Sequence, residues 1–270
     1  MIDAGIFAAL TGLLGLIVGS FLNVCISRLP YDYSAVAPRS SCPHCGTMIA
    51  WYDNIPVVSF VVLGGQCRSC RAGISFRYPA VELLTGALFA YVAWNTGPGW
   101  ETVKWCAFSA IVVELIFSDL ETRILPDEFT KGGMMLGFLL SPIAMLPAGI
   151  VTWVTLLLHP GAKPALLSLL HSLGAAGLLS GGLWLVGELY SRLRGKEGLG
   201  FGDVKMVACL AAFLGLESTL LGLMAGSLLG AVIGLAYIKI RKLDTDTYEL
   251  PFGSFLGLGA LMAMATVIAG

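Results

Sequence analysis

The sequence predicts an all-α polytopic membrane protein of about eight transmembrane helices, with a small cytosolic zinc-ribbon-like insertion. Of 270 residues, 57% are hydrophobic and only 12% are charged, whereas a soluble domain carries about 25% charged residues. The mean hydropathy of +0.84 and the 34 glycines are typical of helices that pack closely in lipid. The net charge of −1 provides no basic field for nucleic acid.

Eight apolar stretches are long enough to be candidate spans, since a helix needs about 20 apolar residues to cross a bilayer and fewer inside a bundle. The first lacks a basic n-region and is longer than the ~7–15-residue core of a signal peptide, so we interpret it as a retained span. The sixth is short and the fourth continues as an apolar stretch toward Leu158, which leaves both boundaries open. The predicted spans are Ala4–Ile26, Tyr78–Asn95, Val103–Ser118, Phe129–Ile150, Ala165–Tyr190, Val204–Leu216, Leu220–Ile240 and Phe252–Ala269.

The basic residues predict the orientation, because cytosolic loops are enriched in lysine and arginine. With both termini outside, only Lys104 and Lys163 face outward. This asymmetry supports an even number of spans. The predicted cytosolic residues are Arg28, Arg39, Arg68, Arg71, Arg77, Arg123, Lys131, Arg192, Arg194, Lys196, Lys205, Lys239, Arg241 and Lys242.

We expect three segments: a first transmembrane helix (1–27), a cytosolic zinc-binding segment (28–77) and a transmembrane bundle (78–270). The middle segment contains two C-x-x-C pairs, formed by Cys42, Cys45, Cys67 and Cys70. This spacing is typical of a four-thiolate zinc ribbon, and a reducing cytosol disfavours the alternative of disulfides. Four protein ligands leave no open position, so the zinc would be structural.

Other residues near these pairs have simpler interpretations. Gly46 and Gly73 suit the tight turns after each pair, where a positive φ is needed. His44 could compete as a ligand, but we expect it to be exposed. The three remaining cysteines, which lie within apolar spans, are interpreted as small hydrophobic residues: Cys25, Cys106 and Cys209.

Two aspartates stand out because charged groups near a bilayer are costly and usually functional. Asp119 ends the third span and Asp203 begins the sixth, and the predicted topology places both at the cytosolic face. Asp203 could alternatively cap its helix, whereas Asp119 opposes the dipole at a helix C-terminus and therefore needs a partner or a role. Asp127, directly after Pro126, is interpreted as an N-cap.

The chemistry expected of two facing aspartates is hydrolysis of a peptide bond. They cannot both ionise, so the charged carboxylate would take a proton from water and the neutral one would donate to the carbonyl oxygen. Gly200 and Gly202 would let a substrate strand approach the backbone beside Asp203. G-x-G-D alone is a weak pattern, but its position opposite a second aspartate strengthens it.

Three further carboxylates lie within predicted spans, and pairing or packing is their expected role, with proton relay as the alternative: Glu82, Glu114 and Glu188.

The sequence resembles the bacterial type IV prepilin peptidases over nearly its whole length. The shared motifs, in order, are G-S-F-L-N-V from Gly19, R-L-P from Arg28, the cysteine pairs flanking W-Y-D-N-I-P from Trp51, R-Y-P from Arg77, E-L-L-T-G from Glu82, D-L-E-T-R-x-L-P-D from Asp119, and G-x-G-D-x-K from Gly200 to Lys205.

The resemblance implies that Asp119 and Asp203 are catalytic. It also implies that the neighbouring residues of the same motifs support the site: Gly200, Gly202, Lys205 and Asp127. It implies cleavage of the basic leader of prepilins and pseudopilins at the cytosolic face of the bilayer. It also implies methylation of the new N-terminal amine by S-adenosylmethionine. No glycine-rich nucleotide fingerprint is present, and we place the methyltransferase site near 51–56 and Glu82 as a hypothesis.

Two other function classes stay open. A carboxylate-relay transporter would use the aspartates and membrane glutamates for protons, although transporters place such groups near the midplane. A scaffold could dock a secretion component on the zinc ribbon. One feature departs from the family: an outward insertion at His159–Pro164, which leaves the limits of the fourth and fifth spans in doubt. We expect a lateral substrate groove beside Asp119 and Asp203. Oligomeric state is not predicted.

Overall fold

The computed structural model describes residues 3–195, 199–241 and 250–269. These residues form helices joined by loops and turns, and their only β-pairings are two isolated bridges, Ser41–Met48 and Gln66–Gly73. The chain divides into two compact units, residues 1–117 and 118–270. Lys196 and Lys242, which were used to predict the orientation, lie outside the described residues.

The first unit is built on α1 (Ala4–Arg28) and α3 (Arg77–Thr96). These helices pack antiparallel, because Gly15 of α1 contacts Gly86 while Gly19, one turn later, contacts the backbone of Glu82. An added Cβ at Gly19 would lie 2.7 Å from the Cα of Glu82, so no larger residue fits there without separating the helices. Small residues allow such close backbone approach between membrane helices.

The polar segment of this unit contains short elements: η1 (Leu29–Tyr31), η2 (Trp51–Asn54) and α2 (Val58–Val62). Arg68, which lies between the two cysteines of the second pair, forms a bidentate ion pair with Asp53 of η2, with N–O distances of 2.6 and 2.8 Å. Val57, at the start of α2, donates its N–H to Glu82 of α3 at 2.7 Å. The polar segment is therefore stabilised by an ion pair within it and by a hydrogen bond to α3 of the same unit.

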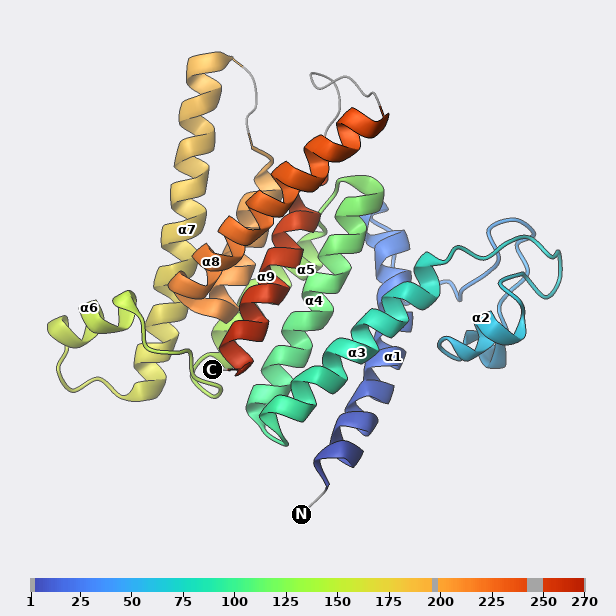
Figure 1. The fold of residues 1–270 in the computed structure, drawn as a ribbon, viewed down its shortest axis with the longest axis horizontal. Coiled ribbons are helices and arrows are strands. Elements are labelled where there is room, and N and C mark those ends of the chain that lie inside the picture. Colours follow the sequence, from blue (N-terminus) through green and yellow to red (C-terminus); the bar gives the residue numbers. More distant parts are fainter. Residues whose placement is uncertain (1–2, 196–198, 242–249, 270) are drawn as a thin grey trace. The chain divides into compact units, whose positions relative to one another are not determined.

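The helix α4 (Trp100–Thr122) continues from the first unit into the second. The second unit then contains α5 (Asp127–Leu140), α6 (Ile150–Leu158), α7 (Pro164–Arg194), α8 (Phe201–Arg241) and α9 (Phe252–Ala269). Within this unit, the ends of α4 and α7 and the starts of α5 and α9 lie on one side (Figure 1).

The helix α8 consists of two segments that meet at Gly215, whose φ of 77° and ψ of −175° are not helical. The first segment packs on α5, with Gly137 against Ala212, and the second packs antiparallel on α9, with Gly222 against Gly259. The two segments therefore pack on different helices, and the chain changes direction at Gly215. The predicted sixth and seventh spans correspond to these two segments.

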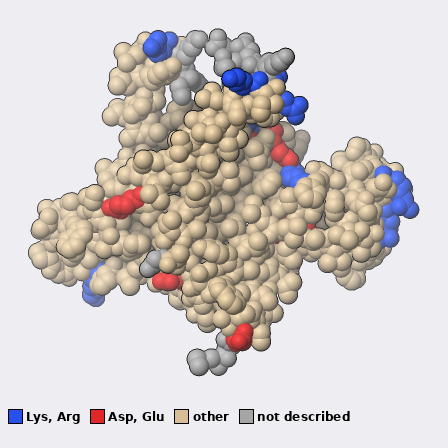
Figure 2. Space-filling model, in the orientation of Figure 1, with Lys and Arg blue, Asp and Glu red and all other residues tan. Residues whose placement is uncertain are grey.

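Among the residues that the structure describes, four helices are long and apolar enough to cross a membrane: Ala4–Tyr31, Pro164–Arg194, Phe201–Arg241 and Phe252–Ala269. Most of the visible face carries neither basic nor acidic side chains (Figure 2). The count of eight spans stays a prediction. The predicted extent of the fourth span is wrong, because α5 ends at Leu140, just before Ser141-Pro142, and proline does not support helical hydrogen bonding. The His159–Pro164 insertion connects α6 to α7.

Candidate active site

The structure brings Asp119 and Asp203 together at one end of the second unit. Asp119 lies in the last turn of α4 and is only 5% exposed. Asp203 is the third residue of α8 and is partly exposed. The two carboxylates lie within range of direct electrostatic interaction, although 83 residues separate them along the chain. The meeting that was predicted from topology is therefore present.

Asp119 is held by the N-terminus of α9. Its Oδ2 accepts hydrogen bonds from the backbone N–H of Ser254 and from the Ser254 hydroxyl, both at 2.7 Å. Ser254 is the third residue of α9, where N–H groups have no partner within the helix and where the helix dipole favours an anion. The unfavourable position of Asp119 at the end of α4 is thus compensated by the start of another helix.

Gly253 lies directly against this carboxylate, where an added side chain would make an unusually tight contact. A Cβ at this position would lie 3.1 Å from the Cγ of Asp119. Neither Gly253 nor Ser254 was predicted from the sequence. The available signal was Pro251-Phe252-Gly253-Ser254, a helix start with a small residue and a hydroxyl, but this pattern does not reveal which anion it receives.

Asp203 does not cap its helix. The residue that precedes α8 is Gly200, whose carbonyl accepts the N–H of Asp203 at 3.1 Å. The Asp203 carboxylate accepts no hydrogen bond from the residues that the structure describes. It is therefore available for a substrate or water, and the interpretation of Asp203 as a cap is not supported.

The glycines beside Asp203 leave room around the carboxylate. An added Cβ at Gly200 would lie 3.5 Å from Oδ2 of Asp203, and one at Gly202 would lie 3.4 Å from Leu125. Both are ordinary contacts, so the fold itself does not demand glycine at either position. Their proposed role in admitting a substrate strand stays a prediction.

Asp127 is not the N-cap that was predicted. The cap position of α5 is Pro126, and Asp127 makes no capping bond. Proline fixes φ near −65° just before the helix, which lets Asp127 take the first helical position and pair with lysines instead. Its carboxylate binds Lys131 at 2.7 Å and also Lys205 of α8. These hydrogen bonds, led by that of Lys131, hold the pKa of Asp127 below its ordinary value.

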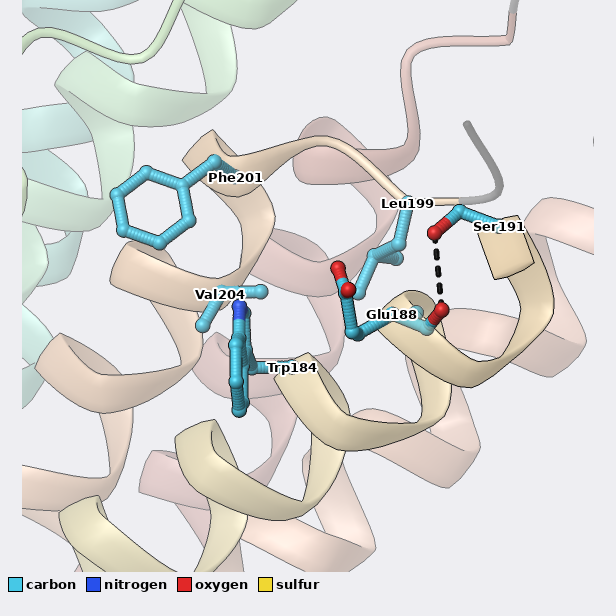
Figure 3. A pocket seen from close by; sticks show the side chains of 7 residues that line it. Trp184, Glu188, Ser191, Leu199, Phe201 and Val204 are labelled. Carbon is cyan, nitrogen blue, oxygen red and sulfur yellow. Dashed lines mark hydrogen bonds between the residues drawn. The ribbon is translucent and has the colours of Figure 1, made fainter. Parts of the chain in front are cut away.

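Two cavities lie against the start of α8. One, of about 230 Å³, lies between α7 and α8 and is lined by Trp184, Glu188 and Phe201, among others (Figure 3). The other, of about 490 Å³, extends from there to Lys131 and Met134 of α5. Neither is lined by Asp119 or Asp203, so the groove predicted beside both aspartates stays a prediction.

The membrane glutamates have different surroundings. Glu188 pairs with Arg192 one turn later at 2.7 Å, as expected for a packing or pairing role. Glu114 is fully buried within α4. Glu82 is 7% exposed and accepts the N–H of Val57.

The four cysteines of the polar segment form a compact cluster. The sulfurs of Cys42, Cys45, Cys67 and Cys70 all lie within 4.8 Å of one another, and those of Cys42 and Cys70 are 3.8 Å apart. A tetrahedral site with Zn–S bonds of about 2.3 Å requires S–S distances near 3.8 Å. The cluster can therefore hold a metal ion. No disulfide is present in it.

The turns around this cluster correct one prediction. Gly46, four residues after Cys42, has the expected positive φ of 69°. In the second turn the equivalent residue is Arg71, with φ 61°, and Gly73 has no positive φ. The prediction for Gly73 was therefore wrong, because the turn needs its left-handed residue directly after the second cysteine. His44 is exposed as expected, and Cys25, Cys106 and Cys209 are buried.

Two family models match this chain. The family described as "Bacterial Peptidase A24 N-terminal domain" matches residues 13–96, and the "Type IV leader peptidase family" matches residues 106–235. A protein of Pseudomonas aeruginosa named "Prepilin leader peptidase/N-methyltransferase" is 35% identical over 281 residues, covering 96% of this chain and 90% of the relative.

The chain belongs to the type IV leader peptidase family. A relative of the same name from Aeromonas hydrophila is 35% identical, covering 96% of this chain and 90% of its own length. Another, from Neisseria gonorrhoeae, is 36% identical, covering 86% of this chain and 82% of its own. No solved structure matches the chain. The leader peptidase match contains Asp119, Asp127 and Asp203, while the N-terminal match contains all four cysteines.

Proposed function

We propose that this member of the type IV leader peptidase family is a membrane aspartyl endopeptidase that cleaves the basic leader of prepilins and pseudopilins. Asp119 and Asp203 form its catalytic pair, and the cytosolic face of the bacterial inner membrane is its place of action. The observation that carries this proposal is the contact between Asp119 and the start of α9, which fixes one carboxylate opposite another.

The two carboxylates have different surroundings and so are suited to different roles. Two hydrogen-bond donors support Oδ2 of Asp119, so this group serves as the carboxylate that takes a proton from water. Asp203 accepts no hydrogen bond from the described part of the chain and carries the shared proton.

The proposed hydrolysis then proceeds in balanced steps. As the water loses its proton to Asp119, its oxygen attacks the scissile carbonyl carbon, and Asp203 protonates the carbonyl oxygen. Collapse of this intermediate breaks the C–N bond: the departing nitrogen takes the proton that Asp119 had accepted, and one hydroxyl of the diol returns its proton to Asp203 as the new carboxyl group forms.

The test is cleavage of a leader-bearing prepilin by the protein in detergent, followed by mass spectrometry. Asp119→Asn and Asp203→Asn should each lower the cleavage rate by about 10²–10⁴-fold, the usual contribution of a positioned acid or base. Glu128→Gln, which removes an exposed carboxylate charge from the same end of the unit, is the matched control and should retain most activity. Normal cleavage by Asp119→Asn would contradict the pair.

The second activity in the proposal is methylation of the new N-terminal amine. S-adenosylmethionine would supply the methyl group from its sulfonium centre. Trp51 and Tyr52 present exposed rings in the polar segment, which suits an adenine ring and a cation. The nearby Val57–Glu82 hydrogen bond links this segment to α3, so the methylation site is placed at 51–56 and Glu82.

Zinc in the four-cysteine cluster would be structural in this proposal. Arg68, next to Cys67, binds Asp53 in the same loop as Trp51 and Tyr52. A metal that fixes the cysteine turns would therefore also fix the loop proposed for methylation. Mass spectrometry of the cleaved product tests the second activity: an added 14 Da that requires S-adenosylmethionine supports it, and no added mass with wild type contradicts it.

A further inference from the structure

A buried acceptor in the first unit has no partner. Asn23 of α1 is only 2% exposed, and its Nδ2 donates to the carbonyls of Gly19 and Tyr78, at 3.3 and 3.0 Å. Because both partners are acceptors, the amide can face them only with its NH₂ group. Its Oδ1 is then an acceptor, and among the described residues it has no hydrogen-bond partner. Such a group is costly to bury.

Glu82 is also buried, and it lies on α3 one helical turn from Tyr78, the residue whose carbonyl Asn23 contacts. The α1–α3 contact places Gly19, one turn from Asn23, directly on the backbone of Glu82. One Glu82 oxygen accepts the N–H of Val57 at 2.7 Å, and the Ser20 hydroxyl also hydrogen-bonds to the carboxylate. A carboxylate can accept about four hydrogen bonds, so two of its acceptor sites are not accounted for by these contacts.

The backbone at Val57, which contacts Glu82, has a strained conformation. Val57 has a φ of 61°, which is a genuine outlier for a β-branched residue. Strain of this kind persists where the surroundings enforce it, often at ligand sites. Here the strained residue is the one that donates to Glu82.

The hydrogen-bond acceptors of Asn23 and Glu82 indicate what kind of ligand could bind here. Asn23 Oδ1 and the Glu82 carboxylate are both acceptors, and the carboxylate brings a negative charge. The nearest cation on α3 is Arg77. Its guanidinium group donates a hydrogen bond to Ser27 at 2.9 Å and lies over the ring of Tyr78, and Tyr78 is one helical turn from Glu82. A small cation with several N–H donors, which is a primary ammonium group, satisfies both acceptors at once.

We propose that Asn23, Glu82 and Ser20 form a binding site for a primary ammonium group. This inference rests on the proposed function, which supplies two such groups: the new N-terminus of the cleaved substrate and the amino group of S-adenosylmethionine. The site lies near the end of α1 and the start of α3, the same ends that connect to the cysteine segment. The new N-terminus is the source that we assign, because methylation must hold that nitrogen in place.

Binding can be measured without any reaction. A synthetic peptide that begins at the mature N-terminus is titrated into the full-length protein in detergent, with S-adenosylhomocysteine present in place of the methyl donor. An N-acetylated copy, which lacks the ammonium group, is titrated in parallel. The free-amine peptide should bind wild type about 10- to 100-fold more tightly than the acetylated one, as expected for a charge-assisted contact.

Variants then assign the contact to residues. Glu82→Gln keeps an acceptor for Val57 but removes the charge, and it should erase most of the difference between the two peptides. Ser20→Ala should reduce it, whereas Ser27→Ala, the same change seven residues later on α1, should not. The thermal midpoint of Glu82→Gln in detergent, compared with that of wild type, shows whether the variant is folded.

The outcomes separate the possibilities. If Glu82→Gln instead weakens binding of S-adenosylhomocysteine, which carries the same amino group as the donor, the ammonium site belongs to the cofactor. If neither ligand is affected, or if wild type does not distinguish the two peptides, the ammonium site is wrong even though cleavage and methylation stand. If wild type cleaves no prepilin, the proposed function itself fails, independently of this site.

Discussion

The backbone N–H and the hydroxyl of Ser254 both donate to one oxygen of Asp119, each at 2.7 Å. A carboxylate at the C-terminal end of α4 is thereby stabilised by the N-terminal end of α9, so that one helix dipole offsets the other. This contact fixes the orientation of the Asp119 carboxylate.

Removal of the Ser254 hydroxyl should weaken this orientation without abolishing it. Ser254→Ala keeps the backbone N–H, so we expect cleavage to fall about tenfold, the equivalent of one hydrogen bond to a charged group. The measurement is the cleavage rate at saturating prepilin. Thr266→Ala is the control in the same helix, since Thr266 donates to the carbonyl of Ala263 and, within the described part of the chain, has no other hydrogen bond from its side chain. An unaffected rate in Ser254→Ala would show that the N–H alone holds Asp119.

Gly253 and Gly202 provide a matched pair of substitutions. Gly253→Ala places a Cβ 3.1 Å from the Cγ of Asp119, which must displace the carboxylate, and we expect at least a hundredfold loss of cleavage because small misplacements of catalytic groups are that costly. Gly202→Ala meets Leu125 at 3.4 Å, an ordinary contact. It should fold with a thermal midpoint close to wild type. Equal cleavage by wild type and Gly253→Ala would contradict the close-contact explanation.

Metal removal should separate the two activities. Cys67→Ser, or treatment with a strong zinc chelator, removes a thiolate or the ion from the cluster and frees the loop that Arg68 holds through Asp53. We expect methylation to be lost while leader cleavage persists, because Asp119, Asp203 and Ser254 belong to the other unit. Metal content by mass spectrometry and both reaction products are the readouts. Cys209→Ser, a buried cysteine outside the cluster, is the control.

The ion pairs of Asp127 predict a dependence of stability on pH. The hydrogen bonds from Lys131 and Lys205 lower the pKa of Asp127 in the folded protein, so its contribution is present above the ordinary pKa of about 4 and is lost as pH falls through the lowered value. Wild type should therefore exceed Asp127→Asn in thermal midpoint at pH 7, and the difference should shrink on acidification. The contribution is small because the pair is exposed.

Glu128→Gln is the control for this experiment, because among the residues that the structure describes Glu128 forms no ion pair. A difference between wild type and Asp127→Asn that grows as the pH is lowered would have the wrong sign for a salt bridge.

Local composition was sufficient to predict much of this protein. The apolar stretches predicted helices, and the C-x-x-C spacing predicted a cluster whose sulfurs do converge. These features are encoded by residues close in sequence, because a helix and a cysteine turn are formed by local hydrogen bonds. The pairing of Asp119 with Asp203 was also predictable, since topology alone puts both at one face.

Tertiary structure decided what distant helices supply to one another. Ser254 could not be assigned to Asp119 from the sequence, because any helix start offers free N–H groups and only packing selects the anion that receives them. Likewise, Asp127 pairs with Lys205 across two helices and does not cap its own. The sequence by itself determined which groups carry charge near the bilayer; the packing of α4, α8 and α9 determined which of them are supported, because hydrogen bonds between helices depend on distances that no local pattern contains.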